Sequence, residues 1–224
     1  MEGIVRAWVD GWVVSRGAAP PVVQPWGWTI DVGTESQVTR HVWGSVGGDV
    51  DEAAVGEVAR AVTGTGVWLK VCHDPAVVGG WLGAGWWVDP EPGHLMTVPL
   101  TGAGEAPDER PSLPAGYRLR TWSRGGVVRV MIAAPDGSWA ARGQIAPTGA
   151  TAVADQVETS QAHRRRGLGS VVMRTLQRAA AEQGAQTGVL AGTEAGRALY
   201  ETLGWRVVAP LTSAKFVGAE RAGA

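Results

Sequence analysis

The chain has 224 residues, with 20 basic and 21 acidic side chains and a net charge of −1, so no overall field attracts nucleic acid or an anionic membrane. Hydrophobic residues make up 45% of the chain and charged residues 18%, which fits one large or two small compact domains without extensive disorder. No apolar stretch is long enough to cross a membrane, and the single cysteine, Cys72, cannot form an intramolecular disulfide. We therefore expect a cytoplasmic globular protein.

The first hundred residues hold most of the twelve tryptophans. Asp51–Val62 is predicted to form a helix, because Val55, Val58 and Ala59 fall on one face together with the final valine. Trp68–Val88 then reads as a strand, a polar turn, a short helix and a second strand. This half is therefore expected to alternate strands and helices.

Thr101–Gly116 is dense in glycine, proline and charged residues and has no apolar periodicity. These features are typical of an exposed connector. We therefore divide the chain into a half of residues 1–100, a linker of residues 101–116 and a half of residues 117–224.

The second half begins with four predicted strands and continues with two helices that alternate with two more strands. The strands that come first are Tyr117–Trp122, Val127–Ala133, Trp139–Ala146 and Thr151–Thr159. They are followed by a helix at Gly167–Gln183, a strand at Thr187–Ala191, a helix at Ala195–Leu203 and a strand at Trp205–Val208. This order predicts an α/β fold (α+β in its antiparallel part) with a mixed sheet flanked by helices.

The strongest chemical motif lies between the fourth strand and the long helix. Its candidate residues are Arg164, Arg165, Arg166, Gly167, Leu168, Gly169 and Ser170. Such a glycine turn presents backbone N–H groups at a helix N-terminus, where phosphate oxygens bind well, and arginines can pair with further oxygens. The alternative is a solvated arginine run beside an ordinary turn.

A second motif follows about thirty residues later. Leu199–Trp205 (LYETLGW) comes after the next strand, and together with Arg164–Gly169 it resembles the GNAT superfamily of acyl-CoA N-acyltransferases. The resemblance covers residues 117–224 and implies a GNAT-like fold with acetyl-CoA as the cosubstrate. It assigns the glycine turn to the coenzyme A pyrophosphate and implies that Thr151–Thr159 splays from its neighbour to pair with the pantetheine arm.

The resemblance also supplies the remaining candidate positions. It assigns Tyr200 to the neighbourhood of the thioester sulfur, and the other candidate cofactor-binding residues are Val157, Thr159, Thr193 and Arg197. The family often has asparagine where Thr193 stands and proline where Gln161 stands. A threonine side chain has no amide group. Whether Thr193 helps to hold the pantetheine arm or the start of the helix is therefore left open.

Transfer to an amine requires a proton acceptor for the amine and a proton donor for the departing thiolate. Tyr200 suits the donor. Asp155 is the preferred base and Glu158 the second choice, because strict alternation along the strand places Asp155 on one face with Val153, Val157 and Thr159, and Glu158 on the other face. A water-mediated base, or none, stays open.

Other sequence features give weaker evidence of function. Cys72-His73-Asp74 has no second cluster at metal spacing, so we expect no metal. His41, His94 and His163 stand alone in the sequence and are interpreted as surface or packed residues. The tryptophans are interpreted as core, although an acceptor pocket with aromatic walls would be consistent with the group Trp26, Trp28, Trp81, Trp86 and Trp87.

Residues 1–100 offer an internal comparison. Trp68–Val88 resembles Val189–Val208 in its order of strand, turn, helix and final strand. Gly44–Val50, however, lacks the arginine and glycine spacing of the phosphate turn, and Tyr200 has no counterpart. We therefore expect residues 1–100 to be a degenerate GNAT-like half that walls the acceptor site, with chance similarity as the alternative.

These observations predict an N-acetyltransferase that moves the acetyl group from acetyl-CoA to a primary amine by direct attack. The alternative is a non-catalytic acyl-CoA-binding or interaction module that keeps the pyrophosphate turn. The expected partner is an amine-bearing acceptor whose identity the sequence does not give, with no nucleic acid or membrane partner, and the protein is expected to be a monomer or homodimer.

Overall fold

The computed structural model describes residues 2–44, 50–100 and 112–218. The first half contains α1 (Glu2–Arg16), β1 (Val22–Gln24), β2 (Gly27–Thr34), β3 (Gln37–Trp43), α2 (Glu52–Ala61), β4 (Val67–Val71), α3 (Pro75–Trp81), β5 (Trp86–Val88) and β6 (Gly93–Pro99). The second half contains β7 (Arg118–Arg124), β8 (Val127–Ala133), β9 (Trp139–Thr148), β10 (Thr151–Thr159), η1 (Gln161–His163), α4 (Leu168–Glu182), β11 (Thr187–Gly192), α5 (Glu194–Thr202) and β12 (Arg206–Phe216).

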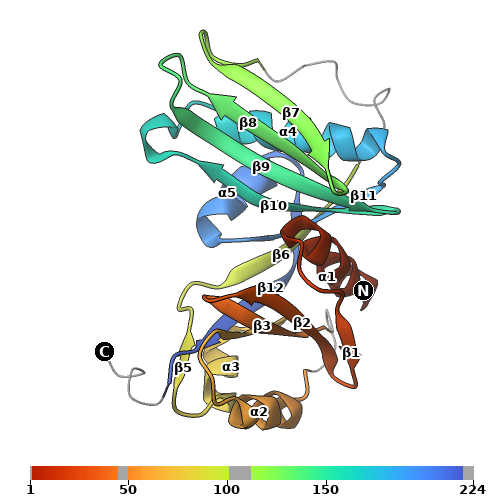
Figure 1. Ribbon diagram of the computed structural model, residues 1–224, viewed down its shortest axis with the longest axis vertical. Helices are drawn as coiled ribbons and strands as arrows, with labels where there is room; N and C mark the ends of the chain where they lie inside the picture. Colours follow the sequence, from red (N-terminus) through yellow and green to blue (C-terminus); the bar gives the residue numbers. More distant parts are fainter. Residues whose placement is uncertain (1, 45–49, 101–111, 219–224) are drawn as a thin grey trace.

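One twisted mixed sheet runs through the molecule in the order β1-β2-β3-β4-β12-β6-β11-β10-β9-β8-β7, with β5 paired to β12. The neighbours β3 and β4 are parallel, as are β10 and β11, and the other pairs are antiparallel. Figure 1 shows α2 and α3 at one end of an elongated molecule, α4 near the other end, and α1 between the two parts of the sheet. The expected mixed α/β fold is confirmed.

Each half of the sheet contains a strand from the other half. β6 lies between β11 and β12, so residues 94–99 pair with residues 187–192. In return, the last part of β12 lies between β4 and β5, where Thr212–Lys215 pairs with Trp68–Val71. The two halves therefore exchange strands near the middle of the sheet.

The predicted elements of the second half lie where the sequence places them, and β8 and β10 match residue for residue. The strand predicted at Trp205–Val208 is only the beginning of β12, which continues to Phe216 because Leu211, Thr212 and Ala214 are buried against the first half. α1 was not predicted. The sequence nevertheless contains the apolar pattern of this helix, because Val5, Trp8, Val9 and Trp12 recur at helical spacing and are all buried.

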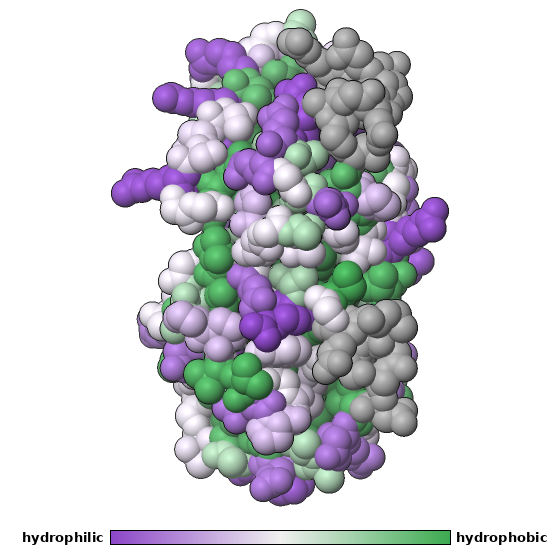
Figure 2. All heavy atoms as spheres, turned by 90° about the vertical axis from the view of Figure 1, so that its right-hand side faces the viewer, coloured by the Kyte–Doolittle hydropathy of each residue, from purple (hydrophilic) through white to green (hydrophobic). Residues whose placement is uncertain are grey.

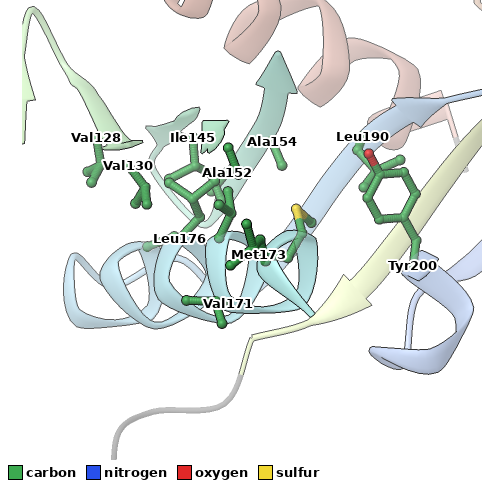
Figure 3. Close-up of a cluster of buried hydrophobic side chains, with 14 of the residues drawn as sticks. Val128, Val130, Ile145, Ala152, Ala154, Val171, Met173, Leu176, Leu190 and Tyr200 are labelled. Atoms are coloured by element: carbon green, nitrogen blue, oxygen red, sulfur yellow. The ribbon is translucent and has the colours of Figure 1, made fainter. Parts of the chain in front are cut away.

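Three hydrophobic clusters hold these layers together. One lies between α4 and the strands β8 to β11 and is drawn in Figure 3. The second surrounds α1 and includes residues of both halves, among them Ile30, Leu95 and Val153. The third packs α2 and α3 onto β4 and β12. Since α1 contacts both parts of the sheet, it belongs to the core of both halves.

The predicted linker falls mostly on residues 101–111, which lie outside the described ranges. On the face shown in Figure 2, polar and apolar side chains of the described residues are interspersed. None of the described helices is long and apolar enough to span a membrane.

Candidate functional site

The predicted phosphate turn joins η1 to α4. Gly167 is the N-cap of α4 with a φ of 74°, and Arg165 also has a positive φ of 61°. Within residues 2–44, 50–100 and 112–218, the backbone N–H groups of residues 165 to 170 have no hydrogen-bond acceptor. These consecutive donors, together with the positive end of the helix dipole, form a concave site suited to an anion.

β10 and β11 separate next to this turn. They pair only from Thr151 opposite Thr187 to Ala154 opposite Leu190. β10 continues to Thr159 without a partner on that side, and β11 continues to Gly192. The opening exposes backbone groups of residues 155–159 on the same end of the sheet as the turn, where the Arg164 Nε donates to the Thr159 carbonyl at 3.5 Å.

A bulge in β10 changes which side chains share a face. Gln156 has a φ of 52°, and the register with β9 shifts between Asp155, opposite Gln144, and Glu158, opposite Arg142. Two residues of β10 therefore oppose one of β9, and the alternation reverses.

The expected alternation is consequently wrong. Val153 packs in the cluster around α1, whereas Val157 packs against the cluster around α4 and Thr159 Oγ1 points toward Gly169. Asp155 and Glu158 lie on one face, since their β9 partners are two residues apart. Nothing in the sequence signals the bulge, because its positive-φ residue is a glutamine rather than a glycine.

Asp155 is held by four hydrogen bonds. Arg16 binds both of its oxygens, with Nε at 2.5 Å and Nη2 at 2.9 Å. Ser15 Oγ donates at 2.8 Å, and the backbone N–H of Gln156 donates at 2.9 Å. Both oxygens of Asp155 are therefore occupied by donors from the protein itself.

Glu158 is more open. Its side chain is 53% exposed, and its contacts are hydrogen bonds from Arg142 Nε and Nη2 to Oε2 at 3.2 and 2.9 Å. Oε1 has no hydrogen-bond partner in the described part of the chain. Of the two predicted carboxylates, Glu158 therefore has the freer oxygen.

Tyr200 lies on α5 with its side chain buried. Its ring packs over Gly192 and Gly196, where an added Cβ would lie 2.9 Å from Cε2. Figure 3 shows the ring beside β11, near Leu190. Burial, and to a smaller extent the charge of Asp155, raises the pKa of Tyr200 to about 12, so the phenol keeps its proton at neutral pH.

Thr193 is the N-cap of α5, where its Oγ1 accepts a hydrogen bond from the Gly196 N–H at 3.2 Å. A hydroxyl thus suffices for the helix start that an asparagine would otherwise cap. Arg197 pairs with Glu201 at 2.7 Å and more distantly with Glu194 at 3.9 Å.

All three histidines interpreted as isolated have partners: His41 Nδ1 lies 3.0 Å from Thr29 Oγ1 on the neighbouring strand, and the other two have partners on more distant elements. Buried His94, from β6, places Nε2 2.5 Å from Glu194 Oε2 at the start of α5. His163, just before the arginine run, places Nδ1 2.9 Å from the Tyr117 hydroxyl. The contacts of His94 and His163 join residues far apart in the sequence, so no local sequence pattern predicts them.

A pocket of about 740 Å³ opens over the face that carries the two carboxylates. Its wall includes Ser15 and Arg16 from the end of α1 and Trp122, Arg129, Trp139 and Glu158 from the sheet. The tryptophans considered as acceptor walls (Trp26, Trp28, Trp81, Trp86 and Trp87) do not line it and lie in the first half instead. Ser15 and Arg16 were not predicted, because the sequence does not show that α1 reaches β10.

Comparison with known proteins gives a consistent result. Residues 140–213 match the family model "FR47-like protein". A GCN5-related N-acetyltransferase from Kribbella flavida has 17% identity and a TM-score of 0.61, with 96% of this chain and 98% of that chain covered. A GNAT-family putative acetyltransferase from Novosphingobium aromaticivorans has 18% identity and a TM-score of 0.55, with 95% of both chains covered.

A tandem GNAT protein from the clavulanic acid biosynthesis pathway has 17% identity and a TM-score of 0.55, with 96% of this chain and 94% of that chain covered. No curated protein matches the sequence. The chain thus has the GNAT fold, as the two motifs predicted.

Proposed function

We propose that the protein is an N-acetyltransferase that moves the acetyl group of acetyl-CoA to a primary amine by direct attack. The observation that carries this proposal is the row of acceptor-free N–H groups at residues 165–170, placed beside the opening between β10 and β11. A pyrophosphate needs such donors, and an extended acyl-carrying arm needs such an unpaired strand edge.

The residues fit this cosubstrate. The backbone of Arg164–Ser170 would hold the pyrophosphate, and the exposed side chains of Arg165 and Arg166 would add charge. A Cβ at Gly169 would lie 2.8 Å from Leu199 Cδ2, so a side chain there would require Leu199 to move. The backbone at Val157 and Thr159 would pair with the pantetheine arm, and Thr193 and Arg197 flank its end.

When bound, acetyl-CoA supplies a thioester carbonyl and a thiolate leaving group. Tyr200, which holds its proton at neutral pH, would donate it to the departing sulfur. Glu158 would accept the amine proton through its free oxygen, whereas Asp155 would fix Arg16 and the end of α1 in place. We therefore propose Glu158 as the base, ahead of Asp155, because its Oε1 has no partner among the described residues.

Direct attack also fits the state of the only thiol. Cys72 is buried beside α1, and burial raises its pKa to about 12, so it keeps its proton and is a weak nucleophile. It lies in the cluster around α1 and does not line the pocket.

We further propose that residues 1–100 are a degenerate half-copy of residues 117–224 and form the acceptor wall. The order β3-α2-β4-α3-β5 repeats as β10-α4-β11-α5-β12, with the first two strands parallel in each case. Ser15 and Arg16 line the pocket beside Glu158, which supports the wall. The counterpart of the phosphate turn, at Gly44–Val50, lies mostly outside the described residues.

A direct test measures thiol released from acetyl-CoA in the presence of a panel of primary amines. We expect turnover with a subset of amines and none after Gly169→Asp. Tight coenzyme A binding without release for any amine would instead support the non-catalytic acyl-CoA-binding module.

A further inference from the structure

The floor of the pocket consists of two adjacent rows of side chains that cross the sheet. In the first row Trp122 of β7 lies opposite Arg129 of β8, which lies opposite Gln144 of β9 and then Asp155 of β10. In the second row Met131, Arg142 and Glu158 succeed one another in the same way. Because paired residues share a face, all these side chains point into one space.

The charges of this floor do not cancel. Arg16 pairs with Asp155, and Arg142 pairs with Glu158. Arg129 is half-buried, and among the described residues the one hydrogen bond of its side chain runs from Nη1 to the carbonyl of Arg124 at 3.1 Å. In the part of the chain that the structure describes, neither Arg129 nor Arg124 forms an ion pair, so a positive charge in excess of the carboxylates lies at the β8 end.

The pocket continues past Arg129. A second hollow of about 590 Å³ shares Ser15, Arg16, Trp122 and Arg129 with the first and also reaches Arg124. Glu158 on β10 and Arg129 on β8 are two strand spacings apart and lie in adjacent rows, so their backbones are about 12 Å apart. An acceptor whose amine lies at Glu158 therefore has the Arg129 guanidinium available to an anionic group next to that amine.

Two tryptophans give the pocket an aromatic rim. Trp122 is 41% exposed and Trp139 is 37% exposed, although large aromatic side chains are usually covered. The Arg142 guanidinium carbon lies 5.6 Å from the centroid of the Trp139 ring. Trp122 belongs to the first row and Arg142 to the second, so each row includes or contacts one of these tryptophans. Exposed aromatic faces in a hollow of this size suit a flat, apolar ligand group.

We infer that the acceptor is an anionic amine of small-molecule size, with an oxyanion (carboxylate or phosphate) that binds Arg129 and an aromatic or apolar body that contacts Trp122 and Trp139. This inference rests on the proposed function and names its substrate class. A polycationic acceptor, such as a lysine-rich protein tail, is disfavoured because Arg129 and Arg124 would repel it.

The test compares kcat/KM for matched amines: phenylalanine, its phosphonate analogue, phenylalanine amide, phenethylamine and alanine. We expect the wild-type kcat/KM for an anionic aromatic amine to exceed that for its neutral counterparts by tenfold or more. Comparison of phenylalanine with its phosphonate analogue shows whether the site prefers a carboxylate or a phosphate-like group. Arg129→Gln should lower kcat/KM for the anionic amine by roughly tenfold to a hundredfold and leave the neutral amines nearly unchanged, whereas Arg129→Lys should retain part of the preference.

Trp139→Ala should reduce the difference between phenylalanine and alanine. The control is Arg174→Gln, on the exposed face of α4 away from the pocket, which should leave every ratio unchanged. A wild-type preference for neutral or cationic amines, or an equal loss for all amines in Arg129→Gln, would overturn the inference while the transferase function stands.

If no amine causes thiol release, the proposed transferase function fails. Calorimetric titration with phenylalanine then tests, independently of catalysis, whether the pocket binds an anionic amine. Saturable binding that Arg129→Gln removes supports the anionic site. No binding of either anionic amine overturns it.

Discussion

His94 Nε2 lies 2.5 Å from Glu194 Oε2, although a hundred residues separate them. The histidine belongs to β6 of the first half, and the glutamate begins α5 of the second half. The contact exists because β6 lies between β11 and β12, where His94 is also opposite Gly192. The start of α5 in the second half is therefore positioned partly by the first half.

This exchange predicts that neither half folds alone. A fragment of residues 112–224 lacks β6, so the facing edges of β11 and β12 would leave buried backbone N–H and C=O groups without partners. We expect the fragment to aggregate or to show no cooperative thermal transition by circular dichroism. Co-expression with residues 1–111 should restore a soluble complex. A cooperative transition of the isolated fragment would contradict the prediction.

Gly169→Asp should abolish coenzyme A binding. The added side chain meets Leu199, and its charge repels a pyrophosphate held by the neighbouring N–H groups. Isothermal titration calorimetry should show at least a hundredfold weaker binding in a protein that remains folded. Gly64→Asp is the control, because nothing lies within 4 Å of a Cβ at Gly64. Unchanged affinity in the Gly169 variant would remove the turn from the site.

Tyr200→Phe should lower kcat by roughly tenfold to a thousandfold with little loss of stability, since the ring still packs over Gly192 while the proton donor is removed. The raised pKa of Tyr200, about 12, means that the wild-type donor stays protonated up to strongly alkaline pH. The wild-type rate should therefore show no loss from this group below pH 10. Thiol release across pH 6–10 measures both effects, and a wild-type kcat in the variant would exclude Tyr200 as the donor.

Substitutions at Glu158 and Asp155 should have different effects, the first on the rate and the second on stability. Glu158→Gln is expected to lower kcat by roughly tenfold to a thousandfold, because the proton acceptor is lost. Asp155→Asn should instead destabilise the fold by about 1–3 kcal/mol, because the charge-assisted bonds from Arg16 and Ser15 are weakened. Thermal melts and initial rates compare the two variants. A rate loss confined to Asp155→Asn would restore Asp155 as the base.

Lys70→Met should stabilise the protein near pH 7. Burial, with the nearby Arg40 charge, lowers the pKa of Lys70 to about 7, while the unfolded chain keeps a value near 10.5. As the pH falls from 10.5 to 7, the unfolded state takes up a proton that the folded state does not, so wild-type stability declines in that window.

The gain from Lys70→Met should therefore be largest at pH 7 and vanish near pH 10.5, as measured by denaturant unfolding. Lys215→Met, at the only other lysine, is the matched control for the loss of a lysine side chain. A gain that is equal at both pH values would point to packing rather than proton uptake.

Local patterns determined much of this protein. Period-2 and period-3.6 hydrophobicity located β8, β10, α2 and α4, because strands and helices of these lengths are specified by which side chains face the core. The run from Arg164 to Ser170 predicted the turn before α4, since glycine spacing and a helix start are local properties. The tyrosine, leucine and tryptophan motif indicated the GNAT fold.

Tertiary structure decided the rest. The exchange of β6 and β12, the reach of α1 to Asp155 and the pocket over Arg129 depend on contacts between segments far apart in the sequence, which no sequence window contains. The bulge at Gln156 placed Asp155 and Glu158 on one face, because one residue in a left-handed conformation reverses the alternation of a strand. Which carboxylate keeps a free oxygen was therefore set by packing and not by the order of residues along β10.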